Sequence, residues 1–357
     1  MKKSNLSFWI GIVTLVLALG LVGGYQFYQK KHQPADVVHG YVGGEKINFL
    51  QDPEVVRLLA SRYQINLDIR KAGSIDMIQA DLTGQDFLWP SSETPVQLYT
   101  EKYGAPLQEE MIFTTPIVLY SYREVGDALV QAGMGRKEQD VYYVDIAKLI
   151  QAILKDKTWA DIGLPSLYGD VMIDTTDPSK SNSGNMFAGL VAMILHKEKM
   201  VQDKDVPSIA PDLQAIFAKL GYMSTSSADL FSLYLRNGMG DKTITAGYEN
   251  QLLEFTKMNA QTWQAVQGEF IVLYPEPTIW SSHVMIALND QGTRLIAALK
   301  DPDIQRLAWE QHGFRTSLTG AQEAAATFPL AGIPAEIEKV VSMPDVKAMS
   351  QIIQLFE

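Results

Sequence analysis

Four short polar segments of this 357-residue chain carry the side chains best suited to bind a small ligand. Each segment lies where an apolar, strand-like run gives way to a helix-like one, and each combines hydroxyl or amide groups with glycine or proline. Hydroxyls and free backbone N–H groups at a helix start can hold an anionic or polar ligand. The four segments together predict a binding site rather than a catalytic one. The candidate binding residues are Ser74, Ser91, Ser92, Ser181, Asn182, Ser183, Tyr248 and Glu249.

The strongest of the four segments is Ser181-Asn182-Ser183-Gly184. It follows a strand-like stretch at residues 171–174 and precedes a long apolar helix, so its polar groups stand at the helix start. A serine in such a turn is often only a helix cap, worth about 1 kcal/mol, and this alternative weighs most for Ser74. It weighs less for Ser91 and Ser92, because the preceding proline already fixes the turn and a second hydroxyl exceeds what capping needs.

Two ligand chemistries stay open for these residues. Serine hydroxyls and helix N-termini favour a small oxyanion, even in an acidic protein, because aligned N–H dipoles act locally. Glu249 would oppose a bare oxyanion, and it favours a different small solute that carries an amine or a metal ion. Tyr248 has an alternative of its own, since it can be a core aromatic whose hydroxyl reaches the surface.

Other chemistries lack their sequence signatures. The chain has no cysteine and five scattered histidines without an H-E-x-x-H motif, so neither a thiolate nor a histidine metal site is expected. It has no G-x-S-x-G nucleophile turn and no P-loop. Without residues 1–31 it holds 26 basic and 41 acidic residues, a net charge of −15, which disfavours nucleic-acid binding. We therefore expect no enzyme activity, no cofactor, no metal centre and no nucleic-acid partner.

The segments between these motifs alternate strand-like and helix-like patterns. After a linker at about residues 32–38, residues 46–50 and 65–69 are predicted as strands, a helix begins at Asp52-Pro53, and residues 86–89 form a short strand. This order predicts an α/β fold with a mostly parallel sheet. Later strands are expected at residues 116–120, 171–174, 270–274 and 283–288.

The length of the chain allows two lobes, each with its own core. No Gly/Ser linker or charge block separates them, so we expect strands near residues 112–118 and 275–283 to cross from one lobe to the other. The predicted division places residues 37–115 and 280–357 in lobe 1 and residues 116–279 in lobe 2.

Residues 8–27 form an uninterrupted uncharged stretch of about the length that crosses a bilayer as a helix. A cleaved signal peptide is the alternative, with Ala18-Leu19-Gly20 as a small-x-small site, but the apolar run continues beyond that point. We expect an uncleaved, single-pass anchor within residues 1–31 and a soluble domain on the extracytoplasmic side of the cell membrane. The flanking lysines are balanced, so the positive-inside rule gives no orientation.

The order of the polar motifs resembles the type II periplasmic solute-binding proteins, in the branch that includes molybdate-, sulfate- and phosphate-binding proteins. The resemblance covers about residues 40–357. Its motifs are Gly73-Ser74, Trp89-Pro90-Ser91-Ser92, Asp177-Pro178 leading to Ser183-Gly184, Gly247-Tyr248-Glu249-Asn250, and Tyr274-Pro275-Glu276.

This resemblance implies a two-lobed fold that closes on a ligand held between the lobes by hydroxyls and backbone N–H groups at helix starts. It implies an ABC-type permease as partner. A membrane-anchored ligand sensor or assembly factor with the same fold is the alternative. The ligand contacts that it implies are Ser74, Ser91, Ser92, Ser183 and Tyr248.

Overall fold

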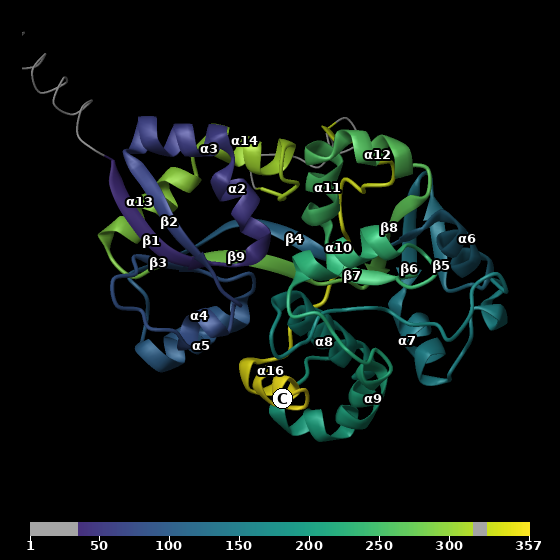
Figure 1. The fold of residues 1–357 in the computed structure, drawn as a ribbon. Helices are drawn as coiled ribbons and strands as arrows, with labels where there is room; N and C mark the ends of the chain where they lie inside the picture. Colours follow the sequence, from purple (N-terminus) through teal and green to yellow (C-terminus); the bar gives the residue numbers. More distant parts are fainter. Residues whose placement is uncertain (1–34, 317–326) are drawn as a thin grey trace, which may run out of the picture.

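The computed structural model describes residues 35–316 and 327–357, which form two α/β lobes side by side (Figure 1). We use lobe 1 for the part built on strands β1, β2, β3 and β9, and lobe 2 for the part built on strands β5 to β8. Both parts belong to one nine-stranded sheet with the order β2-β1-β3-β9-β4-β8-β6-β5, and β7 pairs with β4.

Lobe 1 combines parallel and antiparallel pairing. Strands β2 and β3 lie parallel to β1 on its two sides, and β9 lies antiparallel to β3. Helices cover both faces of this sheet (Figure 1). The strands are β1 (Asp36–Val42), β2 (Ile65–Lys71), β3 (Phe87–Trp89) and β9 (Trp280–Ala287). The helices are η1 (Gly44–Lys46), α2 (Ile47–Gln51), α3 (Pro53–Leu58), η2 (Leu59–Tyr63), α4 (Asp76–Gln79), α5 (Glu93–Tyr103), α13 (Asp290–Leu299) and α14 (Pro302–Glu310).

Lobe 2 holds most of the helices and the larger core. Its strands are β5 (Gly135–Glu138), β6 (Val141–Asp145), β7 (Thr245–Tyr248) and β8 (Phe270–Glu276). Its helices are α6 (Arg123–Gln131), α7 (Ile146–Leu154), η3 (Ala160–Ile162), α8 (Asn182–Leu195), η4 (Asp203–Asp205), α9 (Val206–Ala218), α10 (Ser227–Asn237), α11 (Glu249–Met258), α12 (Ala260–Val266) and α16 (Val346–Gln354).

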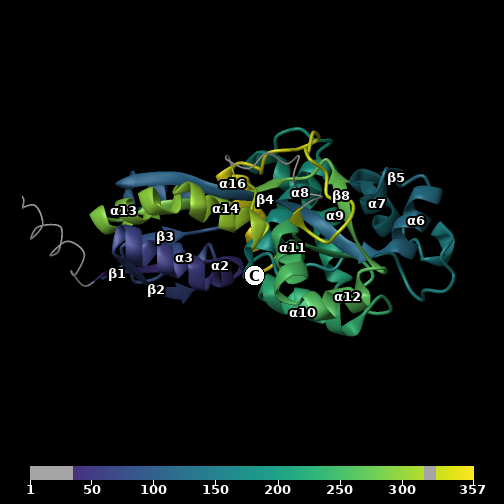
Figure 2. The ribbon, with the colours of Figure 1, turned by 90° about the horizontal axis from the view of Figure 1, so that it is seen from above.

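Strand β4 (Gln108–Tyr122) runs through both lobes, as the view from above shows (Figure 2). Its first part pairs antiparallel with β9 as far as Pro116, and its last part pairs with β7 and β8 from Ile117 onward. The change of partner falls within the crossing expected at residues 112–118. One strand therefore connects the two cores.

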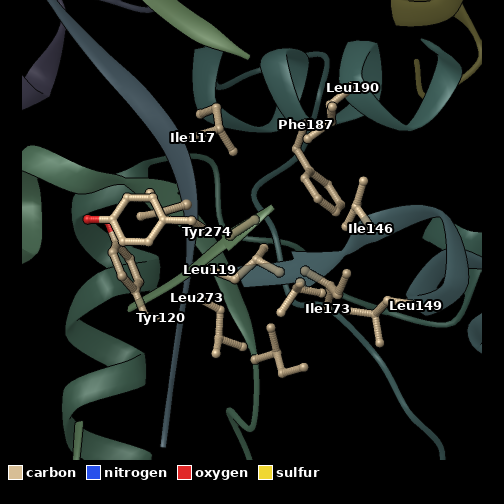
Figure 3. Packing of buried hydrophobic residues seen from close by; sticks show 14 of the residues in the cluster. Ile117, Leu119, Tyr120, Ile146, Leu149, Ile173, Phe187, Leu190, Leu273 and Tyr274 are labelled. Atoms are coloured by element: carbon tan, nitrogen blue, oxygen red, sulfur yellow. The ribbon is translucent and has the colours of Figure 1, made fainter. Parts of the chain in front are cut away.

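The lobe 2 core packs the last part of β4 and strand β8 against helices α7 and α8 (Figure 3). The side chains in this contact are fully or almost fully buried, and each aliphatic one stabilises the fold by about 1.5–3 kcal/mol relative to an exposed position. Those labelled in Figure 3 are Ile117, Leu119, Tyr120, Ile146, Leu149, Ile173, Phe187, Leu190, Leu273 and Tyr274. Phe328, Leu330, Ala348 and Met349 join the same cluster. The predicted division had placed this last part of the chain in lobe 1.

Several sequence expectations agree with the structure, and four differ. The helix at Asp52-Pro53 begins as expected, because the Asp52 carboxylate accepts hydrogen bonds from the N–H groups of the first turn. Residues 46–50, predicted as a strand, are helical instead, and the first strand lies in the stretch taken as a linker, at Asp36–Val42. Residues 171–174 form no strand and contribute a single bridge from Asp174. The sheet is mixed rather than mostly parallel.

Across residues 35–316 and 327–357, none of the helices has both the length and the apolar character needed to span a bilayer. The anchor predicted at residues 8–27 lies outside the described part of the chain.

Candidate functional site

A cavity of about 550 Å³ lies between the two lobes. Its lobe 1 wall consists of the loops that follow β1 and β2. Its lobe 2 wall consists of the turn before α8, the start of α10 and the end of β7. The lining residues are Gly43, Gly44, Glu45, Lys71, Ala72, Gly73, Ser74, Asp76, Lys180, Ser181, Asn182, Thr225, Ser226, Ser227, Asp229 and Tyr248.

Four of the eight predicted site residues line this cavity: Ser74, Ser181, Asn182 and Tyr248. Asn182 is the first residue of α8, and its Nδ2 donates to the Tyr248 hydroxyl at 2.9 Å. The Tyr248 side chain is buried, and burial, followed by the nearby Glu45 charge, raises its pKa well above the ordinary value. The phenol therefore stays neutral and can accept or donate a hydrogen bond at the cavity wall.

Three further predicted residues lie directly behind the wall. The Ser92 hydroxyl donates to Asn182 Oδ1 at 2.7 Å, and the Ser91 carbonyl accepts from Asn182 Nδ2 at 3.1 Å. The Ser183 hydroxyl is paired with Thr176 Oγ1 at 2.8 Å and with Ser181 Oγ at 3.2 Å. These serines are thus engaged by the chain's own groups, and they position the residues that face the cavity.

Glu249 lies away from the cavity, at the start of α11. Its carboxylate is fully buried and accepts from Arg315 Nε at 2.6 Å, from Arg315 Nη2 at 2.8 Å and from the Tyr274 hydroxyl at 2.6 Å. Burial opposes the charge of Arg315, but Glu249 outweighs it and raises the arginine pKa. Glu249 thus neutralises a buried cation within the fold, and a cavity ligand does not meet its charge.

A buried charged cluster at the cavity wall was not found from the sequence. Lys46 Nζ contacts Glu45 Oε1, Ser91 Oγ at 2.8 Å and His283 Nδ1 at 3.1 Å, and Ser91 Oγ also donates to Glu45 Oε1. Lys46 is fully buried, which is rare for a lysine. The signal that could have found it is the pair Gly43-Gly44, which marks a strand-to-helix turn like the four that were identified.

Burial and pairing set the protonation of this cluster. Burial opposes the charge of Glu45, but Lys46, His283 and the hydrogen bond from Ser91 together outweigh it and hold the Glu45 pKa at about 2. Burial, and next the Lys46 charge, holds the pKa of His283 well below its ordinary value. Burial also lowers the pKa of Lys46, and Glu45 opposes that shift. The cluster is therefore a carboxylate–ammonium pair beside a neutral imidazole.

Ser281, His283 and Glu45 follow one another in space like a serine, a histidine and a carboxylate of a catalytic triad. Their geometry does not favour nucleophilic catalysis. Ser281 Oγ lies 3.4 Å from His283 Nε2, and His283 Nδ1 lies 3.6 Å from Glu45 Oε1. The Ser281 hydroxyl is fully buried and donates to the Ser91 carbonyl. Lys46, rather than the carboxylate, contacts His283 Nδ1 closely. A substrate at the cavity cannot reach this serine.

The outer part of the cavity carries both signs of charge. Lys71 and Lys180 stand on its rim with Asp76 and Asp229, and Lys71 Nζ donates to Ser226 Oγ at 3.3 Å across the lobes. Within residues 35–316 and 327–357, no group of three or more histidine or acidic side chains is placed to hold a metal ion. The cavity is therefore suited to a small polar molecule held by hydroxyl, amide and charged groups.

A second cavity, of about 600 Å³, lies beside the β5–β6 hairpin and the segment at residues 338–340. Its charged side chains pair with one another. Glu276 accepts from Arg136, including Nη2 at 2.9 Å, and from Lys339 at 3.1 Å, and the Arg136 guanidinium stacks 4.2 Å from the Tyr143 ring. Because these groups satisfy each other, we take the cavity between the lobes as the candidate site.

Comparison with known proteins identifies the fold. No family model and no curated protein matches the sequence. Solved structures do match over almost their whole length. They include a periplasmic thiamin binding protein, with a TM-score of 0.58 and 11% identity over 90% of this chain and 95% of that chain. The substrate binding protein of an ABC transporter from Agrobacterium tumefaciens gives a TM-score of 0.57 and 11% identity, over 91% and 95%.

Iron-bound HitA from Pseudomonas aeruginosa gives a TM-score of 0.56 and 12% identity, over 89% of this chain and 97% of that chain. At such identities a likeness shows the fold alone, and the narrower expectation of a molybdate-, sulfate- or phosphate-binding protein stays a prediction. The sequence resemblance is confirmed at the level of architecture: the chain has the two-lobed α/β fold of type II periplasmic solute-binding proteins.

Proposed function

We propose that this chain is an extracytoplasmic solute-binding protein, which captures a small polar ligand in the cavity between its lobes for an ABC-type transporter. The observation that carries the proposal is the cavity of about 550 Å³, because polar groups from both lobes converge on it. Proteins with this fold include those named for binding thiamin and iron. In this proposal residues 8–27 anchor the chain in the cell membrane, and the chain has no enzymatic activity and no nucleic-acid partner.

The proposed mechanism is capture followed by closure of the lobes. Ser74 belongs to lobe 1, whereas Ser181, Asn182 and Tyr248 belong to lobe 2, so a ligand that bonds to both sets holds the lobes together. Strand β4 is common to both lobes and is the natural axis for such a movement. The closed form would be the one that a membrane permease recognises.

The two ligand classes considered from the sequence are a small oxyanion and a different small solute. The cavity residues do not support them equally. A small oxyanion would rely on the Ser74 and Ser181 hydroxyls and on the N-terminus of α8. Yet a bare oxyanion occupies only a small part of about 550 Å³, and the cavity presents aspartates and Glu45 beside its lysines. A larger solute with hydroxyl or amine groups uses more of the wall.

A ligand sensor or assembly factor is the second candidate, and a specific observation favours it. Direct hydrogen bonds already join the lobes: Asn182 bonds to Ser91 and Ser92, and Asn48 Nδ2 donates to Glu254 Oε2 at 2.8 Å. These contacts hold the lobes together without any ligand. A protein of this kind could signal or assemble in its closed form instead of transporting a solute.

Thermal unfolding of the full-length chain in a mild detergent tests the proposal. The probes are oxyanions, metal ions, amino acids, sugars and thiamin, each titrated at constant ionic strength. A true ligand at 100 times its Kd stabilises the folded chain by about 2.7 kcal/mol, and Asn182→Ala should reduce that shift. If no probe gives a saturable shift, the sensor or assembly role is the better account.

A further inference from the structure

We propose that Glu45 is a built-in anion of the cavity: its carboxylate occupies the donors that would otherwise hold an oxyanion, so the ligand meets this wall with N–H or O–H donors. The statement about the ligand rests on the proposed function. The statement about Glu45 rests on the geometry of the charged cluster alone.

The donors around Glu45 are fully used. Lys46 has three N–H groups, and it has close contacts with three acceptors: Glu45 Oε1, Ser91 Oγ and His283 Nδ1. The Pro90 carbonyl lies farther away, at 3.5 Å from Lys46 Nζ. The Ser91 hydroxyl accepts from Lys46 and donates its one hydrogen to Glu45 Oε1. Neither residue keeps a donor for an external anion. The serine that sequence analysis assigned to a ligand is therefore satisfied by the chain itself.

The backbone is shaped to admit this carboxylate. A Cβ on Gly43 would lie 2.5 Å from Glu45 Oε1 and 2.7 Å from Ser91 Oγ, distances that real Cβ atoms do not adopt. The Glu45 side chain is only 5% exposed, and Glu45 is one of the residues that line the cavity. The glycine thus leaves room for the carboxylate beside Lys46 and Ser91.

The orientation of Glu45 indicates which ligand groups the wall accepts. The described contacts of its carboxylate with Lys46, Ser91 and His283 all involve Oε1. Oε2 has no partner among these contacts and is not one of the fully buried unpartnered atoms, and Glu45 lines the cavity, so we infer that Oε2 is the acceptor available to a ligand. A second anion placed beside it would be repelled, whereas an amine, amide or hydroxyl could donate to it. The neighbouring Tyr248 hydroxyl adds a further polar partner for such a group.

Chemical rescue tests this assignment with the full-length chain in detergent. Glu45→Ala removes the carboxylate and leaves the Lys46 ammonium buried without its counter-charge, so the variant should be strongly destabilised. Formate matches the missing carboxylate in charge and size. At ten times its Kd for the vacated place, it should raise the folding equilibrium constant of the variant about 11-fold. Formamide, and sodium chloride at the same ionic strength, should not.

Two further variants serve as controls and as a second readout. Glu54→Ala removes a carboxylate from an exposed pair with Arg57 and should show no formate response. Glu45→Gln keeps the volume and removes the charge, so formate finds no vacancy. Sulfate stabilises folded proteins in general, but it should stabilise the E45Q protein more than the wild-type chain, because the negative charge at the wall is gone. This comparison remains informative if the E45A protein does not fold.

Three results would overturn the assignment. One is a folded E45A protein that formate stabilises no better than formamide or chloride does. Another is an equal response of wild-type and E45Q chains to sulfate. The third is a saturable sulfate shift in the wild-type chain that Ser91→Ala abolishes. Formate rescue needs no natural ligand, so it can succeed where the ligand screen fails, and the two proposals are tested separately.

Discussion

Replacing Glu249 with glutamine should destabilise the fold and leave the cavity unchanged. The carboxylate is fully buried, and the side chain of its partner Arg315 is 11% exposed. The substitution keeps a hydrogen-bond acceptor for Tyr274 but leaves the guanidinium without a counter-charge. Removing one partner of a buried ion pair costs about 3–5 kcal/mol. We expect the lower end, about 3 kcal/mol, because the amide oxygen still accepts one bond from the arginine.

Urea unfolding followed by tryptophan fluorescence measures this loss. The double variant E249L/R315M removes both charges and should recover a large part of it, because two apolar groups leave no unpaired charge. Glu54→Gln is the matched control, since its pair with Arg57 is exposed, and it should change stability little. A loss below about 1 kcal/mol for E249Q, or weaker ligand binding without loss of stability, would refute the structural role of Glu249.

Three other changes have equally definite outcomes. Asn182→Ala removes the hydrogen bonds of this side chain to Ser91 and Ser92 across the lobes and the one to Tyr248, so it should cost about 1–3 kcal/mol and increase the radius of gyration in X-ray scattering. Gly184→Ala places a Cβ 2.1 Å from the Thr176 carbonyl oxygen, so α8 must shift and the thermal midpoint should fall well below that of the wild-type chain. The Glu45 pKa is about 2 in the folded chain against an ordinary 4.5, so its contribution to stability is complete above pH 4.5 and is lost as the pH falls toward 2. Glu45→Gln should flatten that part of the stability–pH curve, and a parallel curve would contradict the pairing.

The elements that could be predicted from the sequence are those whose signals are local. Asp52-Pro53 marks a helix start because an aspartate cap and a proline in the first turn act within a few residues. The helix after Ser181 was predicted for a similar reason, since polar residues and a glycine precede a long apolar run. The turns at Ser74 and Asn182 could therefore be predicted from local sequence, and both residues line the cavity between the lobes.

The parts that could not be predicted depend on long-range packing. Residues 46–50 alternate in polarity as a strand does, yet Phe49 and Leu50 are both buried in the lobe 1 core, which adjacent residues of a half-exposed strand cannot be. Burial of Lys46 requires Glu45, Ser91 and His283, and the last is more than 230 positions away in the chain. The pair Gly43-Gly44 marks the turn before Lys46, but no local pattern identifies these distant partners.

The position of β9 in the sheet has a consequence for synthesis of the chain. Strand β9 lies between β3 and β4, although it follows both by more than 150 residues in sequence. A ribosome therefore releases the first strands of lobe 1 long before the strand that joins them to β4 exists. Until residue 287 emerges, β3 and β4 each present an open edge to other chains. We expect the nascent protein to need protection at these edges, and a polypeptide that stops before β9 to aggregate instead of folding as an independent lobe.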